Sequence, residues 1–96
     1  MQKIGELIRS LRGKEGYPLR KVAAFLDIDQ AVLSKIERGQ RKLSREHVIE
    51  LAKFFNYNEN EMLITYLSDQ IVYEIKDEDL AKEALKVAEK KIEYLT

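Results

Sequence analysis

The residues best suited to specific chemistry lie in the segment from Ile28 to Gly39, which has the sequence IDQAVLSKIERG. Leu33 and Ile36 are spaced to face a core, whereas the residues around them are small or polar and can meet another surface. That second set comprises Asp29, Gln30, Ala31, Val32, Ser34 and Lys35. The Gln30 amide can pair with adenine, a small apolar group can touch a thymine methyl, and a lysine can reach guanine or a phosphate. This surface is therefore suited to contacting base edges in the major groove of duplex DNA.

The element that carries these residues is predicted to be a short helix with a second short helix before it. Asp29 is a suitable N-cap and Gly39 suits a left-handed helix end, so we expect a helix from Gln30 to Arg38. Upstream, the segment from Pro18 to Leu26 has helical spacing, with the proline at the first helical position. Two short helices joined by a tight turn form a helix-turn-helix.

Basic side chains flank the two helices and could hold the DNA backbone. They are Arg20, Lys21, Arg38, Arg41 and Lys42. Phosphate contacts set the affinity and the register of a DNA complex but carry no sequence information. Each of these residues taken singly also fits an ordinary solvated charge, and Gln30 also fits a simple cap or surface residue. The cluster around one helix favours the DNA interpretation.

The pattern of apolar and polar residues across this region resembles a known family. It consists of Val22-Ala23, Leu26, Ile28, Gln30, Leu33-Ser34, Ile36-Glu37 and Gly39. It resembles the helix-turn-helix of phage repressor and Cro proteins, often called the XRE family, and the resemblance covers roughly Ile4 to Met62. It implies an all-α, lambda-repressor-like domain that binds double-stranded DNA. In that family the matching glutamate pairs with an arginine of the first helix, which implies an ion pair between Arg12 and Glu37.

Two positions depart from the family pattern. Asp27 stands where a turn glycine is usual, and Leu19 stands where a phosphate-binding glutamine is common. Aspartate tolerates left-handed dihedral angles better than most residues, so we expect the turn to form. The missing glutamine removes one expected phosphate contact.

Helical spacing of apolar residues extends over the rest of the chain and predicts five helices followed by a C-terminal sixth. The expected helices are Gln2–Glu15, Pro18–Leu26, Gln30–Arg38, Arg45–Phe55, Glu59–Ile75 and Leu80–Leu95. Ser44 is expected to cap the fourth helix, and Asp77 or Asp79 the sixth. We expect residues 1–58 to form the DNA-binding domain and residues 59–96 a dimerisation element packed on it.

The last two helices carry more apolar side chains than one small domain needs. The fifth has Ile64, Leu67, Ile71, Val72 and Ile75, and the sixth has a heptad-like seam of Ala81, Leu85, Ala88, Ile92 and Leu95. The sixth helix could fold back on its own domain, or it could be a dimer element that also packs on the fifth helix. For the dimer we expect an interface of Ile64, Leu67, Ile71, Val72, Ile75, Leu85, Ala88 and Ile92.

Charge is distributed unevenly along the 96 residues, although 17 basic and 17 acidic residues give a formal net charge of zero. Residues 1–56 contain 12 Lys/Arg and 7 Asp/Glu, a balance of +5, and residues 57–96 contain 5 and 10, a balance of −5. A basic half beside an acidic half fits nucleic-acid binding by the first. We expect a cytoplasmic protein because no signal peptide or membrane-spanning run of apolar residues is evident.

The sequence offers little for catalysis. It has no cysteine, one histidine (His47) without a nucleophile partner, and no glycine-rich phosphate loop, so we expect neither an enzyme nor a cofactor or metal. We expect a homodimeric transcriptional regulator that binds a palindromic operator, of the kind that controls restriction-modification systems or mobile elements. The alternative is an antitoxin-like protein whose acidic half neutralises a protein partner. A helical module with a decayed DNA site is a third interpretation.

Overall fold

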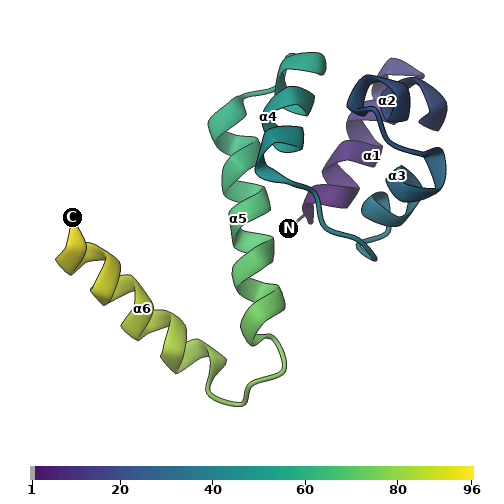
Figure 1. Cartoon of the computed structure of the whole chain (residues 1–96). Helices are drawn as coiled ribbons and strands as arrows, with labels where there is room; N and C mark the ends of the chain where they lie inside the picture. Colours follow the sequence, from purple (N-terminus) through teal and green to yellow (C-terminus); the bar gives the residue numbers. More distant parts are fainter. Residues whose placement is uncertain (1) are drawn as a thin grey trace.

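The computed structural model describes residues 2–96, which form six α-helices and no strand (Figure 1). The helices are α1 (Ile4–Glu15), α2 (Leu19–Leu26), α3 (Gln30–Glu37), α4 (Arg45–Phe54), α5 (Glu59–Ile75) and α6 (Ala81–Leu95). The expected all-α fold is confirmed. No helix within these residues is both long and apolar enough to cross a membrane.

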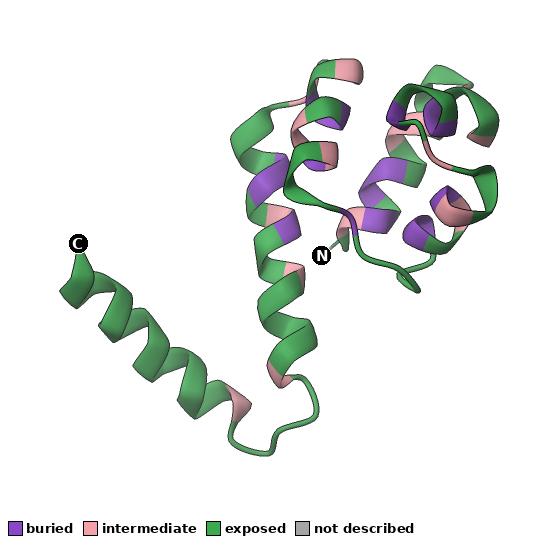
Figure 2. Ribbon diagram, in the orientation of Figure 1, coloured by how far each residue is buried: buried purple, intermediate pink, exposed green. Residues whose placement is uncertain are grey.

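One hydrophobic core holds α1 to α4 together with the first half of α5, as the buried segments of Figure 2 show. Its buried members are Leu7, Ile8, Val22, Ala23, Leu26, Leu33, Ile36, Leu43, Val48, Leu51, Ala52, Met62, Leu63 and Tyr66. The core thus continues past residue 58 as far as Tyr66. This packing fixes the orientation of α3 relative to the other helices.

The turn between α2 and α3 forms without a glycine. Asp27 adopts the left-handed conformation, with φ 58° and ψ 46°, and its neighbour Ile28 donates a backbone hydrogen bond to Ala23 O at 3.0 Å. The expectation that aspartate supports this turn is confirmed. Gly39, in the turn that follows α3, adopts the same left-handed backbone conformation, with φ 76°.

Several predicted helix ends were wrong by one or two residues. α1 begins at Ile4 rather than Gln2, α3 ends at Glu37 rather than Arg38, α4 ends at Phe54 rather than Phe55, and α6 begins at Ala81 rather than Leu80. Pro18 is the N-cap of α2 rather than its first residue, because its ψ of 159° is extended.

The caps agree with the prediction only in part. Ser44 accepts a hydrogen bond from the His47 amide at 3.2 Å, as expected. Asp29 is the N-cap of α3, but its side chain makes no cap hydrogen bond. Neither Asp77 nor Asp79 caps α6, because backbone turns lead into that helix and the Ala81 amide donates to Glu78 O at 3.2 Å.

The C-terminal helices extend away from the core. α5 buries Met62, Leu63 and Tyr66, whereas none of the residues of α6 is buried. After the turn at residues 76–80, α6 diverges from α5 and leaves an open angle between the two helices (Figure 1). α6 neither folds back onto the domain nor packs along α5, and its part in a dimer stays a prediction.

Candidate nucleic-acid interface

The start of α3 projects from the core with its polar side chains outward. Gln30, Ala31 and Lys35 are exposed, as is the N-cap Asp29. Leu33 and Ile36 lie on the opposite face and are buried in the core. The core contacts of Leu33 and Ile36 therefore hold the outer face of α3 in place without using Gln30, Ala31 or Lys35.

Two residues predicted to contact bases are less exposed to a DNA ligand than the others. Val32 and Ser34 are half-buried, and Val32 packs against the core. A side chain partly committed to the core can offer only its outer atoms to a ligand. The exposed amide of Gln30 is therefore the best-placed hydrogen-bonding group at the start of α3 for specific base recognition.

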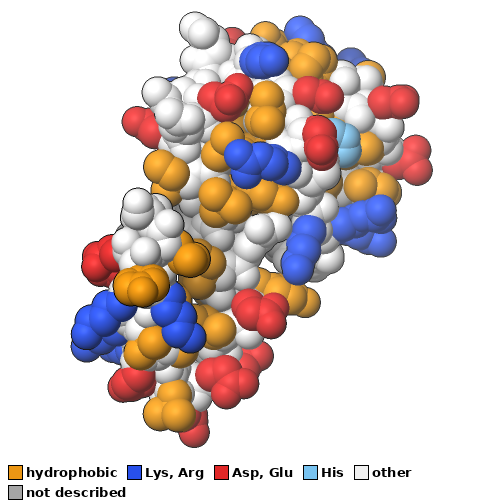
Figure 3. Space-filling model, turned by 60° about the vertical axis from the view of Figure 1, so that its left-hand side comes forward, with side chains coloured by type: hydrophobic (Ala, Val, Ile, Leu, Met, Phe, Trp, Pro, Cys, Tyr) orange, Lys and Arg blue, Asp and Glu red, His pale blue; other side chains and the backbone are white. Residues whose placement is uncertain are grey.

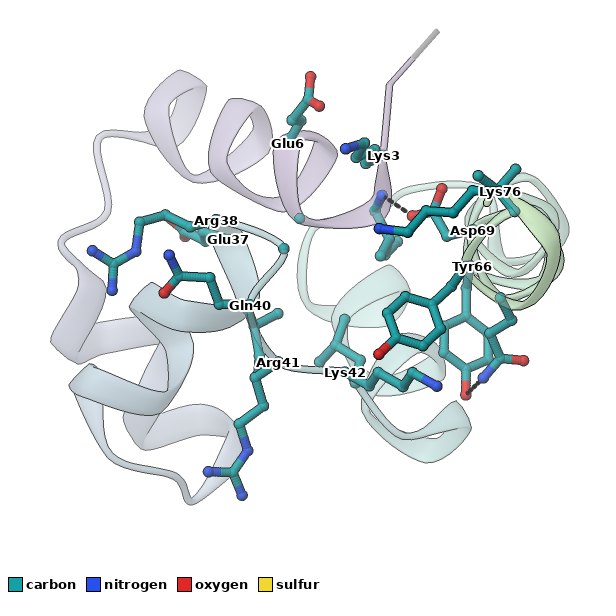
Figure 4. A pocket seen from close by; sticks show the side chains of 18 residues that line it. Lys3, Glu6, Glu37, Arg38, Gln40, Arg41, Lys42, Tyr66, Asp69 and Lys76 are labelled. Atoms are coloured by element: carbon teal, nitrogen blue, oxygen red, sulfur yellow. Dashed lines mark hydrogen bonds between the residues drawn. The ribbon is translucent and has the colours of Figure 1, made fainter. Parts of the chain in front are cut away.

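The five basic residues predicted to contact phosphates are all exposed, but two of them also contact aromatic rings. Lys21 Nζ lies 3.9 Å from the centroid of the Tyr17 ring, and Lys42 Nζ lies 4.3 Å from that of Tyr73. In Figure 4 the side chains of Arg38 and Arg41 extend away from α5, whereas Lys42 lies beside it. Arg38, Arg41 and Lys42 thus follow α3 directly but point in different directions.

Arg12 and Glu37 join α1 to the end of α3. Arg12 Nε donates to Glu37 Oε2 at 2.8 Å and Arg12 Nη2 donates to Glu37 Oε1 at 3.0 Å, so the pairing is bidentate. Arg12 Nη1 also donates to Tyr17 O at 2.9 Å. The hydrogen bonds that Arg12 donates to the Glu37 carboxylate raise the pKa of Arg12 above its ordinary value. Glu37 is only 8% exposed, so this pair satisfies a charge that would otherwise be buried alone.

We expect replacement of either partner by alanine to lower the free energy of unfolding by more than about 1 kcal/mol, beyond the worth of a surface ion pair. Urea unfolding of Arg12→Ala, Glu37→Ala and the double variant measures the coupling between the two side chains. The exposed arginine of the same helix provides the control, Arg9→Ala. Additive losses in the double variant would show that the two side chains do not interact.

Sequence reasoning missed the role of Gly5. A Cβ atom at this position would lie 2.3 Å from Ile36 O and 2.8 Å from Glu37 O, so any side chain would collide with the backbone at the end of α3. The available signal was a glycine inside a predicted helix, where it lowers helix stability and needs a packing reason. Gly5 allows α1 to approach the end of α3 closely.

The contact of Asp69 was missed as well. The N-cap of α1, Lys3, makes no side-chain hydrogen bond, and the first helical amide, Ile4 N, donates instead to Asp69 Oδ2 of α5 at 2.6 Å. A carboxylate is favourable at a helix N-terminus because the helix dipole is positive there. This bond connects the start of α1 to the middle of α5.

Comparison with known proteins places this geometry in context. Residues 8–62 match a family model described as helix-turn-helix. Over 52 residues the chain is 36% identical to a protein of Thermococcus kodakarensis that carries the provisional name of HTH-type transcriptional regulatory protein. The aligned part is 54% of this chain and 16% of that relative, so the chain spans only a small part of its length.

Proposed function

The chain belongs to the XRE-type helix-turn-helix family, whose members bind DNA, and from this premise we propose that it binds double-stranded DNA sequence-specifically and regulates transcription. The observation that carries the proposal is the exposed polar start of α3 on a helix whose other face is fixed in the core. The bidentate Arg12–Glu37 pair supports it by holding the end of the same helix. The family is typically non-enzymatic.

In this proposal Gln30 contributes directly to base recognition. We expect Gln30→Ala to weaken binding to the preferred sequence by about 1–3 kcal/mol and to relax the preference at one base pair. Binding to a library of single-base variants of that sequence measures both effects. The control Ser10→Ala removes an exposed polar group from α1 and should leave the profile unchanged. A profile that Gln30→Ala does not alter would remove Gln30 from the recognition surface.

Arg41 and Lys42 are proposed to contact phosphates. Replacing both with alanine should weaken specific and non-specific DNA binding alike and flatten the salt dependence by roughly one unit of slope per lost contact. Titrations at several salt concentrations measure that slope. The matched variant Lys86→Ala/Lys90→Ala removes two exposed lysines of α6 and should leave the slope unchanged. An unchanged slope for the Arg41/Lys42 variant would place both residues away from the backbone.

We further propose that the regulator acts as a homodimer on a palindromic or pseudo-palindromic operator. A single recognition helix contacts few base pairs, and dimers of this class present two such helices about one DNA turn apart. The exposed stripe of Ile64, Leu67 and Ile71 on α5 supports the proposal, and Figure 3 shows hydrophobic side chains exposed on this side of the molecule. The stripe lies away from the face that buries Met62 and Tyr66.

The exposed seam of α6 is a second argument for the dimer. Leu85 is 42% and Ile92 61% exposed, and none of the 15 residues of α6 is buried. An isolated helix of this length is only marginally stable in water. A second copy packed against α5 and α6 would cover both stripes with the same surface on each subunit. We therefore propose that α5 and α6 form the dimer interface.

The regulated system is proposed to be a restriction-modification system or a mobile element. The competing proposal is an antitoxin-like role, in which the acidic C-terminal half binds a basic protein. Residues 57–96 carry the negative balance and most of α6 is exposed, which is compatible with either role. Genome-wide mapping of bound sites distinguishes them: a bound promoter beside a methyltransferase or nuclease gene supports the first, and one beside a toxin-like gene the second.

A further inference from the structure

A cavity of about 370 Å³ opens between the start of α1, the loop that follows α3, and the second half of α5 (Figure 4). Its apolar lining includes Leu43, Val72 and the rings of Tyr66 and Tyr73. The volume lies in the range of pockets that hold small molecules, which are about 300–1,000 Å³. None of the base-contacting residues proposed above lines it.

The charge of the lining is predominantly positive. Five basic residues (Lys3, Arg38, Arg41, Lys42 and Lys76) and three acidic ones (Glu6, Glu37 and Asp69) line the cavity, and the side chains of Arg38 and Arg41 extend away from α5 (Figure 4). Glu37 is paired with Arg12, which does not line the cavity, whereas Asp69 keeps its negative charge while it accepts the Ile4 amide. The lining therefore carries more positive than negative charge.

Two lysines converge on one aromatic ring at the edge of this cavity. Lys42 Nζ lies 4.3 Å and Lys76 Nζ 5.5 Å from the centroid of the Tyr73 ring. Neither lysine forms an ion pair with a carboxylate anywhere in residues 2–96. The ring attracts each ammonium group but carries no net charge that would neutralise either of them. A bound anion would supply that negative charge.

We propose that this cavity binds a small organic anion, a carboxylate or a phosphate monoester with a compact apolar body. Lys42 and Lys76 hold the charged group. The apolar part lies against Leu43, Val72 and the Tyr73 ring. An organic anion fits better than the DNA backbone because the lining combines paired cations with apolar side chains in a concave space.

The position of the cavity implies that a bound ligand regulates DNA binding, an inference that rests on the proposed DNA-binding function. The ligand would occupy Lys42, one of the proposed phosphate contacts, and would touch α5, the proposed dimer helix. Bound anion should therefore lower the affinity for DNA. By linkage, bound DNA should lower the affinity for the anion by the same factor.

The test of the site itself uses the full chain without DNA. The ¹⁵N-labelled protein is titrated with phenyl phosphate and, in separate arms, with benzoate and inorganic phosphate. We expect saturable shifts of the amides at residues 41–43 and 72–76 with one or both organic anions. Lys42→Gln/Lys76→Gln should raise the dissociation constant at least about tenfold. The matched control Lys86→Gln/Lys90→Gln, which removes the same charge from α6, should leave it unchanged.

Three outcomes would overturn the proposal. These are no saturable shift with either organic anion, equal affinity for inorganic phosphate, or equal weakening by the α6 control. If organic anions fail to bind while Lys42→Gln/Lys76→Gln flattens the salt dependence of DNA binding, the lysines serve the DNA backbone instead. Because the anion titration contains no DNA, its failure leaves the proposed DNA-binding function untouched.

Discussion

Ile71→Asp is expected to produce a folded monomer that binds a full palindromic operator about 100-fold more weakly than the parent protein. Ile71 is 49% exposed and lies outside the core, so the charge should not unfold the domain. In a two-fold dimer position 71 of both subunits would lie in the interface. The variant would therefore bury two carboxylates without partners, and their desolvation would oppose association. Loss of the dimer removes the advantage of binding two half-sites together, while the contacts of a single recognition helix remain.

Sedimentation equilibrium and binding to full and half operators measure this effect. Leu85→Asp should behave like Ile71→Asp, because it places the same charge in the proposed seam of α6. Tyr94→Asp provides the control: Tyr94 is 91% exposed, lies on α6 away from that seam, and should leave the dimer intact. If the unmodified protein is monomeric at high concentration and binds a palindrome no more tightly than a half-site, the dimer proposal is wrong.

Gly5→Ala is expected to lower the free energy of unfolding by about 3 kcal/mol, the largest single effect on stability that we anticipate. The added methyl group would meet Ile36 O at 2.3 Å, and backbone atoms cannot move aside as a flexible side chain can. α1 would have to move away from α3, which would disturb the adjacent Arg12–Glu37 pair. DNA affinity should fall with stability.

Gly13→Ala is the matched control in the same helix. A Cβ atom at Gly13 meets nothing within 4 Å, so alanine there should raise stability by about 0.5–1 kcal/mol through helix propensity alone. Urea unfolding of the two variants should show that the free energy of unfolding falls for Gly5→Ala and rises for Gly13→Ala. A Gly5→Ala variant as stable as the parent protein would show that α1 does not approach the end of α3 as closely as described.

The fold could be predicted largely from local pattern. Leu33 and Ile36 marked the buried face of α3, and the tolerance of aspartate for left-handed backbone predicted the turn at Asp27. Gly5 and Asp69 could not be assigned roles in the same way. Each acts through a partner distant in sequence, the backbone of Ile36 in one case and the Ile4 amide in the other. No local pattern encodes such a pairing.

The limits of prediction are similar at the site. Its position near the start of the second helix placed Val32 with the DNA-contacting residues, and the packing of α3 leaves it half-buried, so its contact with a base stays a prediction. Val72 was grouped with Ile71 because both are apolar residues of one helix. Adjacent residues lie about 100° apart around a helix, and Val72 lines the cavity beside α1. The direction of α6 was open, because helical periodicity does not specify what a helix packs against.

The central claim is that the outer face of α3 recognises DNA sequence. Its most direct test is the selection of bound duplexes from a random DNA library. The purified protein should enrich a two-fold symmetric motif with half-sites centred about one DNA turn apart. Gln30→Ala should relax the base preference at one position of each half-site. Recovery of sequences no different from the starting library, by a protein that is folded and dimeric, would contradict the proposed function.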